Sequence, residues 1–236
     1  MDETEIFPRT RAVRLILASR SPRRRELLAE AGYQFEVILP SEEVEATGQE
    51  LARDESPADL AARLARQKAA DVVQRLADMG LPSGRSLKPT GSPNPSPVTP
   101  KETALPHAIV IGGDTVVECR GQILGKPTDR EHARQILQTL SGQEHRVYTG
   151  LCLWPVPGGQ PRVQTAVSRL RMDPLRPDQL EEYLHSGQWE GKAGAFGYQD
   201  RLGWVHLLEG SESNVVGLPL ELLARMLAEI SGSPIP

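Results

Sequence analysis

The sequence has 236 residues, with 39% hydrophobic and 25% charged composition, which is enough to bury a full core and predicts a single domain over 1–236. A formal net charge of -4 at pH 7 argues against a broad basic surface for nucleic-acid polymers and predicts that any anionic ligand is small and locally held. The two cysteines, Cys119 and Cys152, lack metal-ligand spacing, and a chain without a disulfide framework is typical of the cytoplasm.

The first predicted element is a strand at 13–18, since this apolar run is too short for a signal core or a membrane span, and no membrane partner is expected. A helix follows, with Ser21 as its N-cap, Pro22 as its first residue and Gly32 at its end. The next strand is expected at 35–39.

A longer helix is predicted after Ser56 and Pro57, with an apolar stripe along 58–79 and its end at Gly80. The stretch 81–107 holds seven prolines among serines and glycines, so it cannot maintain helix or sheet hydrogen bonding. We predict a solvated, mobile insertion loop there.

The second half of the chain alternates strands and helices. The apolar run 108–113 predicts a buried strand that ends at Asp114 and leads into a hairpin. Thr128 with Glu131 is a capping-box pattern for a helix that reaches Leu140. The remaining predicted elements are strands at 145–154, 162–171 and 202–208, helices at 177–185 and 219–230, and a glycine-rich connection at 191–199. The alternation predicts an α/β fold with a mixed sheet.

Three consecutive arginines, Arg23 to Arg25, fall in the first turn of the first predicted helix, where unpaired N–H groups and the helix dipole are already positive. Each such cation costs about 0.3–1 kcal/mol when exposed, and a bound anion would reverse this penalty. Ser19 and Ser21 add hydroxyl donors, so the pattern indicates a phosphate site. The alternative is a solvated basic face.

Three further residues are candidates for the same site. Lys68 lies within the apolar stripe of the long helix, where it either meets an anion or extends its ammonium to water. Asp114 at a strand end is a candidate base or metal ligand, although an aspartate there can also cap a turn. Lys126, followed by a proline, suits a positioned cation near phosphate.

Acidic residues are needed beside the arginines if Mg²⁺ is to bind, and Glu42, Glu43 and Glu45 either serve this purpose or form a solvated acidic run. The histidines have no ligand spacing, and no G-x-S-x-G nucleophile motif is present. The chain also lacks a P-loop and a dinucleotide fingerprint, which argues against a P-loop ATPase and a Rossmann dehydrogenase.

Several segments in order along the chain resemble one motif series. They are LILASRSPRRRELL (15–28), ARQKA (65–69), IGGDTVV (111–117), LGKP (124–127), LSGQEHRVYTG (140–150), GKAGAFGYQ (191–199) and VVGLPL (215–220). This series resembles the Maf family of nucleoside triphosphate pyrophosphatases, in the branch that acts on dTTP and UTP. The resemblance implies an extended mixed β-sheet flanked by helices, with two lobes around a cleft, similar to inosine triphosphate pyrophosphatases, and often a homodimer.

The resemblance also implies roles for individual residues. Asp114 matches the general base, and the specificity positions match Arg23, Thr115 and Gln199. The phosphate-side positions are Ser19, Arg24, Lys68 and Lys126. A divalent metal cation, Mg²⁺ or Mn²⁺, is expected on Asp114 and Glu45, with Glu43 as the alternative to Glu45.

Two departures from the family pattern stand out. Gly113 occupies a position that is usually alanine, which loosens the backbone without removing the carboxylate that follows, and the insertion at 81–107 is longer than the usual connection. The rival functions are a relative selective for modified guanine nucleotides, against which the Gln199 segment argues, and a nucleotide-binding regulator of cell division without turnover.

Overall fold

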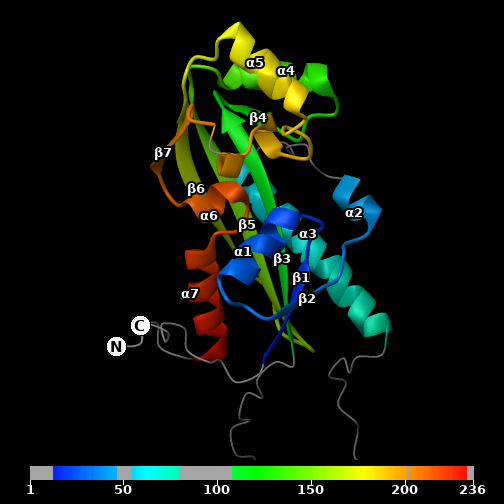
Figure 1. Cartoon of the computed structure of the whole chain (residues 1–236). Coiled ribbons are helices and arrows are strands. Elements are labelled where there is room, and N and C mark those ends of the chain that lie inside the picture. The colour runs from blue at the N-terminus through cyan, green and yellow to red at the C-terminus, as the bar shows by residue number, and fades with distance from the viewer. Residues whose placement is uncertain (1–12, 47–54, 80–107, 201, 233–236) are drawn as a thin grey trace, which may run out of the picture.

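Seven strands pair into one mixed β-sheet in the order β2-β1-β3-β5-β6-β7, with β4 paired to β3 (Figure 1). The computed structural model describes residues 13–46, 55–79, 108–200 and 202–232. The strands are β1 (Arg14–Ala18), β2 (Phe35–Val37), β3 (Ala108–Cys119), β4 (Gln122–Leu124), β5 (Glu144–Val156), β6 (Arg162–Met172) and β7 (Val205–Glu209). β1 is parallel to both of its neighbours, and every other pairing is antiparallel.

Helices cover both faces of this sheet and one of its ends. They are α1 (Pro22–Glu30), α2 (Glu42–Ala46), α3 (Pro57–Asp78), α4 (Arg130–Leu140), α5 (Pro177–Ser186), α6 (Glu212–Val216) and α7 (Leu220–Ser231), with short 3₁₀ turns η1 (Ala193–Ala195) and η2 (Tyr198–Asp200). α3 packs on β3 and β5 from one face, while α1 and α7 bury their apolar residues against the opposite face. α4 and α5 share a separate core with the far ends of β3, β5 and β6 (Figure 1). The predicted α/β class, with a mixed sheet flanked by helices, is confirmed.

The first and third helices begin as their sequences predict. The Ser21 hydroxyl accepts a hydrogen bond from the Arg24 amide at 3.4 Å, and the Ser56 hydroxyl accepts one from the Asp59 amide at 3.1 Å. Each cap is followed by a proline, whose missing N–H costs nothing in the first turn. Gly32, just past α1, has φ of 78°, a conformation that favours glycine.

Two glycines let α3 approach the sheet closely. A Cβ atom added to Gly112 of β3 would overlap the backbone carbonyl of Ala65, and one added to Gly150 of β5 would overlap that of Ala61. Neither glycine has a positive φ, so what each supplies is space and not an unusual backbone conformation. This contact fixes the distance between α3 and the middle of β3.

Several predicted boundaries are wrong. β3 does not end at Asp114 but continues to Cys119, because antiparallel β5 runs beside it and Asp114 pairs with Gly150. The N-cap of α4 is Asp129 and not Thr128, since the Asp129 carboxylate accepts from the His132 amide at 2.8 Å. β7 begins at Val205 and not at 202, and the short helices α2 and α6 were not predicted.

The proline-rich stretch 81–107 lies outside the described residues, and the single domain over 1–236 stays a prediction. In the described part of the chain, no helix combines the length and the apolar character that crossing a bilayer requires. Cys119 and Cys152 are both buried free thiols, and burial raises the pKa of Cys152 to about 12.

Candidate functional site

A pocket of about 310 Å³ opens where the start of α1, the middle of β3 and the glycine-rich segment around η1 and η2 meet. Ten residues singled out from the sequence line it together. They are Ser19, Ser21, Arg23, Arg24, Glu45, Lys68, Asp114, Thr115, Lys126 and Gln199. They come from six separate stretches of the chain, so the tertiary fold brings most of the sequence candidates to one place. Glu43, the alternative metal-side residue, is exposed and is not among the pocket's lining residues.

Lys68 lies between the two carboxylates of the pocket. Its Nζ is 2.5 Å from Oδ1 of Asp114 and 3.1 Å from Oε2 of Glu45. The Lys68 side chain is only 4% exposed, and those of Asp114 and Glu45 are 13% and 16% exposed. The ammonium therefore does not extend to water, and it offsets part of the negative charge of two carboxylates at the pocket wall.

Successive residues of β3 point to opposite faces of the sheet. Asp114 therefore faces α3, where it meets Lys68, while Thr115 faces α1, where its hydroxyl accepts from Arg24 at 2.9 Å. The strand therefore brings the Asp114 carboxylate and the buried Arg24 guanidinium near each other, although Lys68 and Arg24 approach the sheet from opposite faces. This arrangement follows from Asp114 lying within the strand and not at its end.

Arg24 is buried, and its charge is held by neutral oxygens. Its guanidinium donates to the carbonyl of Gly217 at 2.6 Å and to the hydroxyls of Thr115 and Ser19 at 2.9 and 3.3 Å. Burial lowers the pKa of Arg24, and the nearby charges of Asp114 and Glu45 oppose this. Among the described residues, Arg24 forms hydrogen bonds with these neutral oxygens and no ion pair with a carboxylate.

A hydrogen-bonded chain extends from Arg24 to α6. The Thr115 hydroxyl lies 3.0 Å from that of Thr149, which in turn donates to the carbonyl of Asn214 at 2.9 Å. The Asn214 side chain, 1% exposed, donates to Ser168 at 2.8 Å. Thr115 therefore anchors Arg24 in this structure, and Thr149 and Asn214 are residues that the sequence did not single out.

The three arginines of α1 differ in burial and in their contacts. Only Arg24 is buried; Arg23 is half-buried and donates to the Gly191 carbonyl at 3.3 Å, while Arg25 is exposed and outside the pocket lining. Burial lowers the pKa of Arg23, and the negative charge of Asp200 opposes this. Burial also lowers the pKa of Lys126, and the cation of Lys68 adds to that effect.

The glycine-rich segment supplies further lining residues that the sequence analysis did not name. Lys192, Phe196 and Tyr198 line the pocket beside Gln199. Gly194 and Ala195 have positive φ values of 74° and 58°, so the backbone turns sharply at η1. The motif GKAGAFGYQ drew attention to the segment, but which of its side chains face the pocket depends on these turns.

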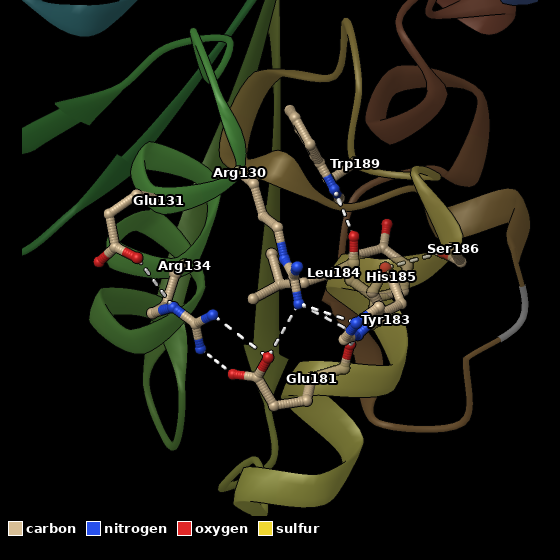
Figure 2. A network of polar contacts seen from close by, with 9 residues as sticks. All are labelled: Arg130, Glu131, Arg134, Glu181, Tyr183, Leu184, His185, Ser186 and Trp189. Carbon is tan, nitrogen blue, oxygen red and sulfur yellow. Dashed lines mark hydrogen bonds and ion pairs between the residues drawn. The ribbon is translucent and has the colours of Figure 1, made fainter.

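Helix α5, which leads into this segment, is tied to α4 by a network of polar contacts (Figure 2). Glu181 of α5 accepts from Arg130 at 3.0 Å and also pairs with Arg134. After the helix, the Trp189 indole donates to the Leu184 carbonyl at 3.0 Å. The chain is therefore anchored just before it enters the pocket wall.

Comparisons with known proteins agree with the motif series. The family model described as "Maf-like protein" matches residues 14–230. A protein named dTTP/UTP pyrophosphatase from Rhodopirellula baltica is 42% identical over 214 residues, covering 90% of this chain and 80% of its own length. Proteins of the same name from Brucella abortus and Symbiobacterium thermophilum are 38% and 37% identical, each covering 94% of this chain and 93% and 95% of their own lengths. A HAM1 protein from Coxiella burnetii has a TM-score of 0.38 at 15% identity, covering 92% of this chain and 99% of its own, and supports no argument at that level.

Proposed function

The chain belongs to the Maf-like protein family, and from this we propose that it is a nucleoside triphosphate pyrophosphatase that hydrolyses dTTP and UTP to the monophosphate and pyrophosphate. The observation that carries the proposal is that Asp114 and Lys68 line the same pocket as Arg23 and Arg24 of α1. Relatives named dTTP/UTP pyrophosphatase, at 37–42% identity over most of the chain, support the substrate class.

The triphosphate would bind among the cations at the start of α1. Arg24 is held rigidly with neutral partners, and Arg23 and Lys126 line the same pocket. Burial lowers the pKa of all three groups, so an anion beside them would be stabilised by charges that are poorly solvated. The Ser19 hydroxyl adds a polar group at the same place.

Asp114 would act on the attacking water. In this role its carboxylate either accepts the proton of the water or, when it binds a metal cation, orients the water, whose proton then passes to solvent. The water oxygen bonds to the α-phosphorus, while the bond from that phosphorus to the bridging oxygen breaks and pyrophosphate leaves. Lys68, 2.5 Å away, keeps the carboxylate oriented and compensates its charge. General bases of this kind contribute about 10²–10⁴-fold to rate.

A divalent cation, Mg²⁺ or Mn²⁺, would be held by Asp114 and Glu45. Their carboxylates already share one cation, the Lys68 ammonium, and Mg²⁺ commonly uses one or two carboxylates with water and substrate phosphate oxygens. Two carboxylates would leave coordination positions for water and for substrate phosphate oxygens. When bound, the cation would neutralise negative charge on the phosphate oxygens.

The proposal is tested with a panel of dTTP, UTP, CTP, ATP, GTP and a modified guanine triphosphate. Phosphate release is measured in a coupled assay with inorganic pyrophosphatase, with and without Mg²⁺ or Mn²⁺. The expected result is turnover of dTTP and UTP far above the others, lost at least about a hundredfold in Asp114→Asn without loss of fold. Preference for a purine nucleotide would refute the substrate class, and nucleotide binding without release would favour the regulator.

Two accompanying proposals concern the molecule as a whole. The homodimer implied by the resemblance is tested by light scattering on the purified protein, where a monomer at working concentration contradicts it. The cytoplasmic location is tested by fractionating cells that express the full chain.

A further inference from the structure

An ion pair closes the glycine-rich segment on itself at the pocket wall. Nζ of Lys192 lies 2.5 Å from Oδ2 of Asp200, and the two side chains are 13% and 16% exposed. The Tyr183 hydroxyl of α5 donates to the same carboxylate oxygen at 3.3 Å. Because the pair is largely shielded from water, it restrains the segment more strongly than a surface pair would.

Gly197 provides the space in which this pair forms. A Cβ atom there would overlap both the Lys192 ammonium and the Asp200 carboxylate. Gly197 does not have a positive φ, so its backbone conformation does not require glycine. The absence of a side chain at Gly197 therefore leaves the space that the Lys192–Asp200 pair occupies.

The pair also fixes the residue beside it. Asp200 follows Gln199 directly, both belong to η2, and the Asp200 amide donates to the Gly197 carbonyl at 3.2 Å. Tyr183, 6% exposed, ties this turn to α5, which is itself held to α4 by Glu181 (Figure 2). Rotating or displacing η2 would thus require breaking contacts to two other parts of the fold.

We propose that Lys192 and Asp200 form a latch that positions Gln199 for reading the nucleobase, and that these two positioning residues set base choice. The inference rests on the proposed function and on the specificity role that the resemblance gives Gln199, which lines the pocket. A side-chain amide offers both a donor and an acceptor, and a uracil-type edge offers O2 and O4 acceptors beside an N3–H donor. Such matching discriminates only when the amide is held still, since a small misplacement leaves its polar groups unpaired.

The latch is tested by measuring kcat/KM for dTTP, UTP and CTP on Lys192→Met, Asp200→Ala and the double variant. Each single variant is expected to lower the dTTP-to-CTP ratio about tenfold to a hundredfold, mainly through loss on dTTP. The double variant is expected to lose no more than either single one, because both break the same contact. Arg169→Met, which breaks the exposed pair with Glu209, is the matched control and should leave the ratio unchanged.

A third single substitution perturbs the Lys192–Asp200 pair at Gly197, the residue that leaves room for it. Gly197→Ala displaces only the flexible ends of two side chains, so it should fold and reproduce the loss of discrimination. Asp200→Asn is nearly isosteric. If the larger substitutions fail to fold, the dTTP-to-CTP ratio of Asp200→Asn tests the proposal in the same way.

Three results would overturn the inference. One is an equal fall in kcat/KM for all nucleotides, which indicates general damage to the enzyme. Another is a lower dTTP-to-CTP ratio in Lys192→Met with an unchanged ratio in Asp200→Ala, which indicates direct nucleotide contact by Lys192. The third is additive losses in the double variant. If the parent enzyme prefers a different base, the proposed substrate is wrong, while the ratio for the preferred base still tests the latch.

Discussion

His145 should make the protein sensitive to mild acid. Its side chain is 2% exposed and lies edge-on to Phe196, with ring centroids 5.4 Å apart and planes at 80°. Neither ring nitrogen has a hydrogen-bond partner of normal geometry. Burial lowers the pKa of His145 from 6.5 to about 4, an effect that the Gln143 backbone and the charge of Glu118 only partly oppose.

The sign and size of the effect follow from this difference in pKa. The folded protein binds the proton more weakly than the unfolded chain, so the stability from neutral His145 is fully present above about pH 6.5 and is lost as the pH falls toward about 4. The full difference corresponds to about 3 kcal/mol, of which about 2 kcal/mol is lost by about pH 5.

The measurement is the free energy of unfolding in urea at about pH 7.5 and about pH 5, for the parent and for His145→Leu. The variant should lose about 2 kcal/mol less than the parent on acidification. His206, which contacts Asp173, is present in both proteins and cancels in the comparison. His132→Gln is the matched control and should keep the parent's pH dependence. Equal losses in the parent and His145→Leu would refute the reasoning.

Three further predictions concern packing and position. Gly112→Ala should lower the free energy of unfolding by about 1–3 kcal/mol, because its Cβ meets the Ala65 backbone; Gly113→Ala meets only the Arg24 side chain, at 3.2 Å, and should cost less in the same urea titration. Thr149→Val should raise KM for the triphosphate about fivefold with kcat little changed, because it breaks the series of hydrogen bonds that holds Arg24. Thr149→Ser should restore KM, and a fall in kcat alone argues against this role. Glu181→Gln should reduce stability by less than about 1 kcal/mol, since the Glu181 side chain is 43% exposed, and a loss above about 2 kcal/mol in thermal melts contradicts that.

The sequence predicted the elements whose boundaries depend on local chemistry. Ser21 and Ser56 cap their helices because a hydroxyl followed by proline satisfies the first turn wherever the helix lies in the fold. The strands that pair as β5 and β6 were predicted within a few residues for the same reason, since their patterns and the turn between them are local. Two of the wrong boundaries were at Asp114 and Thr128, where the choice depended on a pairing strand or on a competing cap.

The sequence also identified many of the residues that meet in the pocket, through the motif series and not through spacing alone. The candidates Arg25 and Glu43 lie outside the pocket lining, and the chemical roles of the residues that line it stay predictions. Charge in an unusual place was the useful local signal, as with Lys68 in an apolar stripe and the arginines in a first helical turn.

The tertiary structure alone decided how these residues face one another. Consecutive helical residues point in directions about 100° apart, so only the packing of α1 determines that Arg24 is buried while Arg25 is exposed. The partners of Lys68, the unpaired ring of His145 and the Lys192–Asp200 pair likewise depend on distances between segments that the chain brings together on folding. Sequence pattern determines how a side chain is oriented on its own helix or strand, whereas its partner is determined by how neighbouring elements pack. Gly112 and Gly150 show this, because they let α3 approach the sheet closely and so bring Lys68 to Asp114.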